Sequence, residues 1–226
     1  MKHIFFTLIL SLSTVFTVWY GFNHNSELKK NHTETPPTLL SATLLTPAKT
    51  IADFSLTTTD GHPFTHHSLL GHWTLLFFGY AQCPDICPRT MVTVAEIWKQ
   101  MPAALLQTQT LRFVFVSLDP ESDTVQSLGA FLKRFHPSFI GLTGAESVIQ
   151  RLGKSCGIYS WEDPNANTEG GPKIIDHSAT LLLINPQGRI QALFSPPHQT
   201  EAIAKDLQFL LERRPKDMHK VIHSSD

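Results

Sequence analysis

The alternation of apolar and polar positions divides the chain into an apolar start, a polar stretch and a longer region of mixed pattern. Residues 4–22 form an apolar run without a charged side chain, and a polar, proline-containing stretch follows it. Further on, continuous apolar runs of strand length cover residues 73–80, 111–118 and 180–185. Such runs are typical of strands that are buried on both faces of a sheet.

Amphipathic patterns with the helical period lie between and after these runs. They predict helices over residues 88–100, 123–135, 145–153 and 200–213. Asp123 stands at the start of the second helix, where a carboxylate can accept backbone N–H groups. We therefore expect Asp123 to be the N-cap of that helix.

Two short turn sequences predict β-hairpins on either side of this region. The dipeptide DG separates residues 54–59 from 63–65, and the tripeptide PQG joins 180–185 to 189–194. The predicted order of the core is β-α-β-α-α-β-β-α. This order indicates an α/β fold with a thioredoxin-like mixed sheet and flanking helices, preceded by an N-terminal transmembrane helix.

The apolar start has the length of a membrane-spanning segment. A helix over residues 4–22 would rise roughly 28 Å, about the thickness of the bilayer hydrocarbon. Lys2 precedes the run and favours a cytoplasmic N-terminus, while Trp19 and Tyr20 fall where an interfacial aromatic belt is expected. We therefore expect residues 1–22 to be a single-pass membrane anchor. A cleaved signal peptide is the alternative interpretation.

Three further segments are expected after the anchor. They are a flexible tether at 23–46, a thioredoxin-like domain at 47–213 and a polar tail at 214–226. The orientation of the anchor places the domain outside the cytoplasm. Because no long Arg- and Ser-rich transit sequence precedes it, a bacterial inner membrane with a periplasmic domain is favoured over a mitochondrion.

Composition narrows the class of partner. The chain has 226 residues with a formal net charge of −1, and 42% of them are hydrophobic. Without a basic excess to neutralise phosphates, nucleic acid is not an expected partner. The 3 cysteines are too few for a disulfide-stapled scaffold, so two close cysteines indicate a redox pair or a metal pair.

Cys83 and Cys87 form that pair, in the connection between the strand at 73–80 and the helix at 88–100. Such connections lie at the carboxyl edge of an α/β sheet, where ligands bind. A helix start also stabilises thiolates, so we expect both cysteines to ionise readily. Residues four apart share a helical face, roughly 6 Å from each other, which suits either a disulfide or a shared metal ion.

His177 is the candidate for a third ligand, because it stands just before the strand at 180–185. In a thioredoxin-like sheet, the loop that leads into this strand faces the reactive cysteines. Two thiolates and an imidazole favour copper or zinc over magnesium or calcium. Three ligands satisfy Cu(I), whereas structural zinc normally has four. From the residues alone, a surface histidine and a metal-independent redox pair remain open.

The remaining reactive side chains have simpler interpretations. Cys156 is expected to be a lone thiol in or near the core, and His198 lies in a loop at a strand end. Asp85 lies between the two cysteines, where it would tune their charge or meet a partner. Four histidines before the first long strand indicate a solvated loop, with a second, weak metal patch as the alternative: His62, His66, His67 and His72.

Three stretches of the chain resemble the Sco (SenC) family of copper chaperones. They read FFGYAQCPDICPRT at 77–90, SLDPESDT at 117–124 and DHSATLLLINPQG at 176–188. Their order, their spacing and the apolar N-terminal segment also match. The resemblance covers residues 47–213, and residues 154–176 are similar to the family's inserted hairpin.

The resemblance implies a copper site, for Cu(I) or Cu(II), with Cys83, Cys87 and His177 as ligands. It also implies that the two cysteines cycle between dithiol and disulfide. The implied role is a metallochaperone, rather than an enzyme, that helps to build the CuA centre of cytochrome c oxidase. The oxidase subunit that carries CuA would be the partner, together with another copper chaperone or a thiol reductase.

Two other roles use the same cysteines. A membrane-anchored thiol–disulfide oxidoreductase would keep partner cysteines reduced, with copper incidental to that activity. A redox or copper sensor would act through interaction alone. A shared fold does not decide between these roles.

Overall fold

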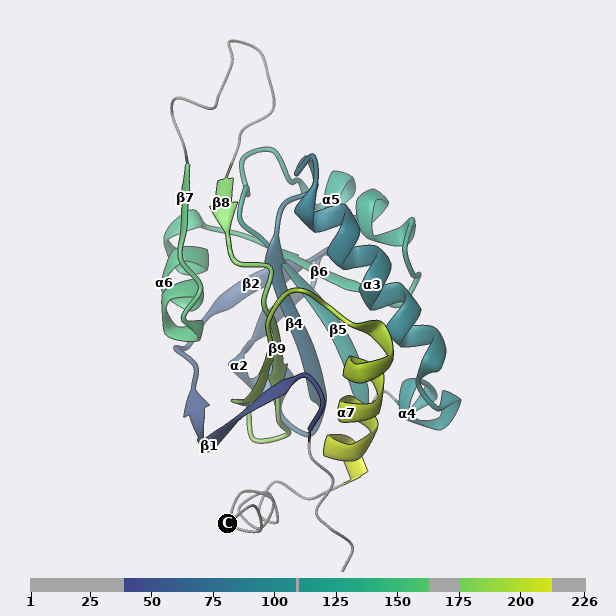
Figure 1. The fold of residues 1–226 in the computed structure, drawn as a ribbon. Coiled ribbons are helices and arrows are strands. Elements are labelled where there is room, and N and C mark those ends of the chain that lie inside the picture. Colours follow the sequence, from purple (N-terminus) through teal and green to yellow (C-terminus); the bar gives the residue numbers. More distant parts are fainter. Residues whose placement is uncertain (1–38, 109, 163–174, 213–226) are drawn as a thin grey trace, which may run out of the picture. The chain divides into compact units, whose positions relative to one another are not determined.

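The computed structural model describes residues 39–108, 110–162 and 175–212, which fold around an 8-stranded mixed sheet (Figure 1). In sheet order its strands are β1 (Ala42–Thr50), β10 (Arg189–Phe194), β9 (Leu181–Ile184), β4 (Trp73–Gly79), β5 (Leu111–Ser117), β6 (Ile140–Thr143), β2 (Ser55–Thr58) and β3 (Pro63–Thr65). The neighbours β4, β5 and β6 run parallel. The other pairs are antiparallel.

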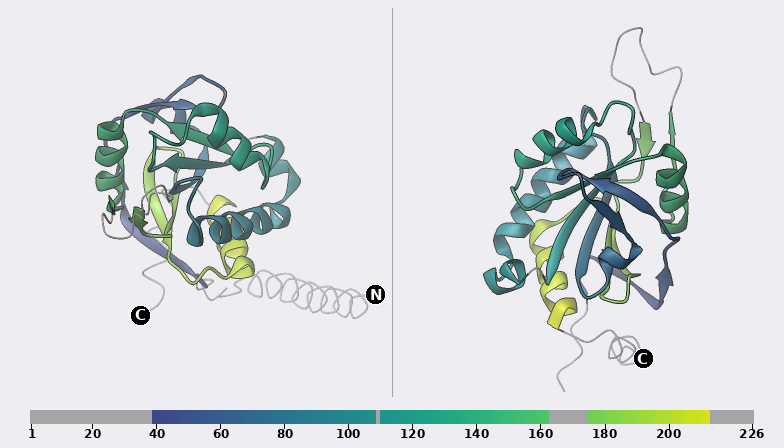
Figure 2. Two further views of the ribbon diagram at one scale, coloured as in Figure 1. Left: turned by 90° about the horizontal axis from the view of Figure 1, so that it is seen from above. Right: turned by 180° about the vertical axis from the view of Figure 1, so that it is seen from behind.

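Helices cover both faces of this sheet, as Figures 1 and 2 show. They are α2 (His66–Leu69), α3 (Ile86–Gln100), α4 (Ala103–Gln107), α5 (Val125–Lys133), α6 (Glu146–Cys156) and α7 (Thr200–Glu212). Apolar side chains of α3, α5 and α7 share one core with the sheet. Those of α6 belong to a second core on the opposite face.

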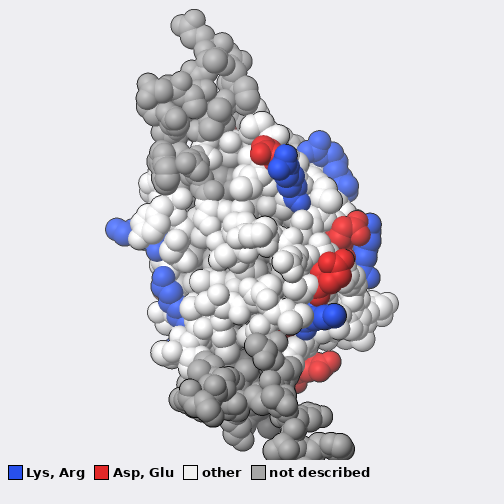
Figure 3. Space-filling model, in the orientation of Figure 1, with Lys and Arg blue, Asp and Glu red and all other residues white. Residues whose placement is uncertain are grey.

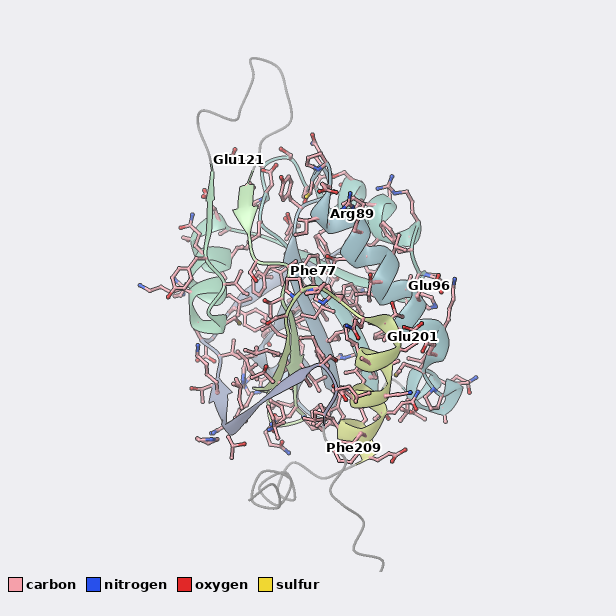
Figure 4. The ribbon with its side chains drawn as sticks, in the orientation of Figure 1. Phe77, Arg89, Glu96, Glu121, Glu201 and Phe209 are labelled. Carbon is pink, nitrogen blue, oxygen red and sulfur yellow. The ribbon has the colours of Figure 1, made fainter. Side chains whose placement is uncertain are left out.

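The strand β4 explains why its sequence shows no alternation. Every residue of β4 is buried. Leu75 and Phe77 belong to the core beneath α3, whereas Leu76 and Phe78 belong to the core beneath α6. Figure 4 shows Phe77 in the middle of the domain. A strand whose side chains pack into a core on each face is apolar along its whole length. The strand predicted at 73–80 is therefore confirmed to within one residue.

A short hairpin stands apart from the main sheet. Its strands, β7 (Ser160–Glu162) and β8 (Ile175–His177), pair antiparallel with each other. In Figure 1 this hairpin lies at the end of the sheet where α3 begins. The carboxyl end of β4 and the strand that carries His177 therefore occupy the same end of the domain.

The sequence missed the strand β6, which lies between two predicted helices. Gly141, in its middle, has no room for a side chain, because a Cβ there would lie 2.6 Å from Leu132 Cδ1 and 2.7 Å from Thr59 Cγ2. The glycine lets α5 pack closely on the sheet. It also weakens the local strand signal, since glycine has a low β propensity.

Two helix starts differ from their predicted positions. The helix α3 begins at Ile86, so Cys87 lies in its first turn rather than before it. The N-cap of α5 is Thr124, whose side chain accepts the Ser127 N–H at 3.1 Å. The assignment of this cap to Asp123 was therefore wrong. The Asp123 side chain is buried instead of facing the helix end.

The strand β1 begins within the segment that was interpreted as tether. Residues from Ala42 onward pair with β10, and Asp206 of α7 holds the start of β1. Its carboxylate accepts the backbone N–H of Leu40 at 2.9 Å, of Ser41 at 2.7 Å and of Ala42 at 2.8 Å. The folded domain thus begins before residue 47. The expected anchor, most of the tether and the tail lie outside the described residues.

The described part of the chain contains the helices α2 to α7. None of those helices combines the length and the apolar character needed to cross a bilayer. The expected anchor at 4–22 stays a prediction.

Candidate metal centre

The two cysteines lie where β4 gives way to α3, at the carboxyl end of the sheet's central strand. Cys83 is in the loop and Cys87 in the first helical turn, and the structure contains both as thiols. The Cys87 N–H donates to Cys83 Sγ at 3.4 Å. Cys87 is fully buried, whereas Cys83 is 9% exposed. The pair therefore has an inner and an outer sulfur.

Gly79, the last residue of β4, makes room for the inner sulfur. A Cβ at this position would lie 2.8 Å from Cys87 Sγ and 3.0 Å from Phe115 Cζ. The next backbone N–H, that of Tyr80, forms a hydrogen bond with Cys87. The strand end therefore holds this sulfur through close packing and through a hydrogen bond from the backbone.

The expectation that both thiols ionise readily was wrong for Cys87. A hydrogen bond with the Cys83 side chain raises the pKa of Cys87, and burial raises it further. The N–H of Tyr80 lowers the pKa, but it does not outweigh these two effects. The start of α3 cannot compensate for removing the thiolate from water. Cys87 is thus a protonated thiol that donates its hydrogen bond to Cys83.

Tyr80 connects the cysteine loop to the strand β8. Its side chain is only 1% exposed, and its hydroxyl accepts the backbone N–H of Ile175 at 3.3 Å. The same hydroxyl forms a hydrogen bond with the Cys83 side chain. Burial raises the pKa of Tyr80 to about 12, so the phenol stays protonated at neutral pH.

His177 is the last residue of β8, where its backbone pairs with that of Ser160. Its side chain lies outside the described part of the structure. Ile175, two residues earlier, is buried in the same apolar cluster as Cys83 and Cys87. The structure thus brings the start of β8 to the cysteines, and the position of the imidazole stays a prediction.

The buried carboxylate of Asp123 holds the cysteine loop through hydrogen bonds. Asp123 Oδ2 accepts the Ala81 N–H at 3.0 Å and the Ser117 hydroxyl at 2.7 Å. The hydroxyl of Thr143 donates to the backbone carbonyl of Asp123 at 3.1 Å. Burial raises the pKa of the Asp123 carboxyl. The sequence did not reveal this contact, because the carboxylate stands two positions before a helix and resembles a cap.

Two other histidines, His66 and His198, contact backbone carbonyls. His66 Nε2 lies 3.0 Å from the Gly188 carbonyl oxygen, and His198 Nε2 lies 2.8 Å from that of Ala179. Burial lowers the pKa of His198, which keeps its ring neutral. No group of three His, Cys, Asp or Glu side chains suited to a metal occurs within the described residues. This part of the chain therefore supplies two of the three predicted ligands.

Cys156 lies in a different core from the cysteine pair, and Asp85 lies between the two cysteines at the surface. Cys156 is buried in the second core, where burial raises its pKa to about 11, so its interpretation as a core thiol is confirmed. Asp85 forms an exposed ion pair with Arg89 at 2.8 Å. Figure 4 shows Arg89 near the start of α3. The face drawn in Figure 3 mixes acidic and basic side chains, in line with the near-neutral net charge.

A family model and individual relatives of this chain point to the same protein family. Residues 42–212 match the family model SCO1/SenC. The chain is 33% identical over 169 residues to a candidate copper-binding protein of Stutzerimonas stutzeri, covering 75% of this chain and 80% of that protein. It is 37% identical over 139 residues to the mitochondrial SCO2 homolog of Danio rerio, covering 60% of this chain and 48% of that protein. The matched region thus spans about half of the mitochondrial relative.

Solved structures agree with this assignment and with the fold. Copper-bound ScoI of Arabidopsis thaliana superposes with a TM-score of 0.62 at 31% identity, covering 70% of this chain and 98% of that one. Apo Sco1 of Thermus thermophilus gives a TM-score of 0.65 at 31% identity, covering 75% of this chain and 95% of that one. The predicted mixed sheet with flanking helices is confirmed.

Proposed function

This chain belongs to the SCO1/SenC family, and we propose on that basis that it binds copper and acts in the assembly of cytochrome c oxidase. The observation that carries the proposal is the pair of adjacent thiols at the carboxyl end of β4. Thiolate sulfur is a soft ligand, which favours Cu(I) over harder ions. Solved structures of family members with copper bound support copper as the metal.

The proposed ligands are Cys83, Cys87 and His177. Cys83 lies in the loop before α3 and Cys87 in its first turn, and the Cys87 backbone N–H donates to Cys83 Sγ at 3.4 Å. Because Cys87 is a protonated thiol, its proton must leave when its sulfur binds the metal. His177 is proposed because it follows Ile175 by two residues in β8, and alternate residues of a strand share a face. We propose that copper passes from these ligands to the CuA-bearing oxidase subunit by ligand exchange.

A second candidate function is thiol–disulfide exchange with a partner's cysteines. The different exposure of the two cysteines favours it, since the more exposed Cys83 can attack a partner and the buried Cys87 can resolve the mixed disulfide. In that reaction Cys83 and Cys87 lose two electrons and two protons to become a disulfide, and the partner disulfide becomes two thiols. The same residues serve both roles.

We also propose that residues 1–22 anchor the protein in a bacterial inner membrane, with the domain in the periplasm. The uninterrupted apolar run and its flanking residues support this. A protease added to intact spheroplasts should digest the domain. Protection of the domain until the cells are lysed would contradict the proposed orientation.

The main experiment measures copper bound by the full-length protein after reduction and reconstitution with Cu(I) under anaerobic conditions. The parent should bind copper stoichiometrically, and Cys83→Ser, Cys87→Ser and His177→Ala should each bind it more weakly. His67→Ala, an exposed histidine of α2, is the matched control and should bind like the parent. Unchanged copper affinity in His177→Ala would contradict its assignment.

A deletion strain separates the two candidate functions. Loss of oxidase activity that is restored by added copper would support copper delivery. Restoration by a small thiol reductant, but not by copper, would support thiol–disulfide exchange and contradict the delivery role.

A further inference from the structure

Tyr80 interacts with both cysteines and with the strand that carries His177. Its backbone N–H forms a hydrogen bond with Cys87, and its carbonyl accepts the Cys83 N–H at 3.3 Å. Its hydroxyl contacts the Cys83 side chain and the Ile175 N–H. The backbone contacts need no particular side chain, whereas the hydroxyl contacts require tyrosine.

The chemistry of a phenol fixes the direction of both hydroxyl contacts. A phenol has one hydrogen to donate and an oxygen that can accept. The N–H of Ile175 can only donate, so the oxygen of Tyr80 accepts there. The O–H hydrogen is then available to the sulfur of Cys83. The result is a chain of two hydrogen bonds that links β8 to the outer sulfur.

This link joins segments that are distant in the sequence, since Tyr80 and Ile175 are 95 residues apart. Within the described residues, β8 belongs to a two-stranded sheet with β7 and not to the main sheet. Its alignment with the cysteine loop therefore depends on contacts such as this one. The hydroxyl lies in a buried place, where no bulk water can replace its hydrogen bonds.

We propose that the Tyr80 hydroxyl is the positioning group of the metal centre, which holds β8 against the cysteine loop and stabilises the sulfur of Cys83. The part of this proposal that concerns copper rests on the proposed function. The part that concerns β8 and the cysteine pair does not. Tyr80→Phe tests both parts, because it removes the oxygen and keeps the buried ring. Tyr159→Phe is the matched control, since Tyr159 is 64% exposed.

The first test uses the metal-free, full-length protein. In a glutathione buffer, Cys83 and Cys87 form their disulfide as one glutathione disulfide becomes two glutathiones. The hydroxyl stabilises the reduced form, in which Cys83 is the stronger acceptor. Tyr80→Phe should therefore shift the dithiol–disulfide equilibrium of Cys83 and Cys87 about tenfold toward the disulfide. This corresponds to a fall of about 30 mV in the reduction potential of the pair. Tyr159→Phe should match the parent.

Hydrogen–deuterium exchange gives a second metal-free measurement. In Tyr80→Phe the peptide that contains Ile175 should exchange faster than in the parent, because its N–H has lost its acceptor. Peptides of β9 should be unchanged, which shows that the variant is folded. Parent-like exchange at Ile175 together with a parent-like potential would overturn the proposal.

Copper affinity completes the test. Tyr80→Phe should bind Cu(I) about tenfold more weakly than the parent, and Tyr159→Phe should bind it equally well. A parent protein that does not bind copper would overturn the proposed function. In that case a shifted potential and faster exchange at Ile175 would still support the positioning role, so the two failures are distinguishable.

Discussion

The carboxylate of Asp123 accepts the backbone N–H of Ala81 at 3.0 Å, so the loop after β5 holds the loop that carries the cysteines. The same oxygen accepts the Ser117 hydroxyl. Asp123 is only 1% exposed, and no helix cap explains its burial. Two buried side chains therefore hold the cysteine loop: Asp123 through the Ala81 N–H, and Tyr80 through the Cys83 side chain.

Replacing Asp123 should destabilise the domain in a graded way. Asp123→Ala leaves the Ala81 N–H and the Ser117 hydroxyl without their acceptor, which should cost about 2–3 kcal/mol. Asp123→Asn keeps an acceptor oxygen and should cost less. Urea unfolding of the full-length protein at neutral pH measures both losses. Equal losses in the two variants would contradict the role of the oxygen as acceptor.

The stability conferred by Asp123 should also depend on pH. Burial raises the pKa of this carboxyl above its ordinary value of 3.8, so the folded protein binds its proton more tightly than the unfolded chain. The raised pKa of Asp123 therefore adds to the free energy of unfolding in full below pH 3.8. This stabilisation is lost as pH rises through the folded-state pKa. The stability of the parent minus that of Asp123→Asn should be greater at pH 4 than at pH 7. Unfolding curves at the two pH values check this sign.

Gly79→Ala should strain the cysteine site. The added methyl would meet Cys87 Sγ at 2.8 Å and Phe115 at 3.0 Å, and overpacking of this kind costs about 1–3 kcal/mol. Gly129→Ala is the matched control, because its nearest contact is an ordinary 3.5 Å and alanine favours the helix. Thermal unfolding should show a lower midpoint for Gly79→Ala only. A parent-like midpoint for Gly79→Ala would be inconsistent with this packing.

Cys156 should make the parent lose stability at alkaline pH. Burial raises the pKa of Cys156 from 9.0 to about 11. The protonated thiol therefore adds to the free energy of unfolding in full below pH 9, and this stabilisation is lost as pH rises through 11. The amount is at most about 2–3 kcal/mol. Cys156→Ala should show a shallower decline over this interval in urea unfolding. A decline as steep as that of the parent would contradict the buried thiol as its cause.

Asp206 should control the attachment of β1. It accepts three successive backbone N–H groups, those of Leu40, Ser41 and Ala42. Asp206→Ala should remove about 2 kcal/mol of stability and leave the start of β1 open to hydrogen exchange. Peptides of β4 serve as the internal control and should keep their protection. Continued protection of β1 would show that pairing with β10 suffices.

The parts of the fold that were predicted correctly are those whose signal is local. The strands β4, β5 and β9 are apolar at nearly every position because both their faces are buried. The cysteine pair was recognised because its motif lies between a buried strand and a helix. The strand β1 was missed because it mixes apolar and polar residues without a regular pattern and is half-exposed. The strand β6 was missed because it is short and contains Gly141.

The contacts that organise the candidate site could not be read from local patterns. Tyr80 reaches Ile175 across 95 residues, and Asp123 reaches Ala81 across 42. Neither residue differs in the sequence from an ordinary core tyrosine or a helix cap. The raised pKa of Cys87 likewise depends on burial by the tertiary fold, which the helix start alone does not reveal.

The most direct test of the central claim is X-ray absorption at the copper edge of the Cu(I)-loaded full-length protein. The proposed site predicts a first shell of two sulfur atoms, from Cys83 and Cys87, and one imidazole nitrogen. His177→Ala should lose the nitrogen and keep both sulfurs. A first shell without sulfur, or an imidazole nitrogen that persists in His177→Ala, would contradict the proposed copper site.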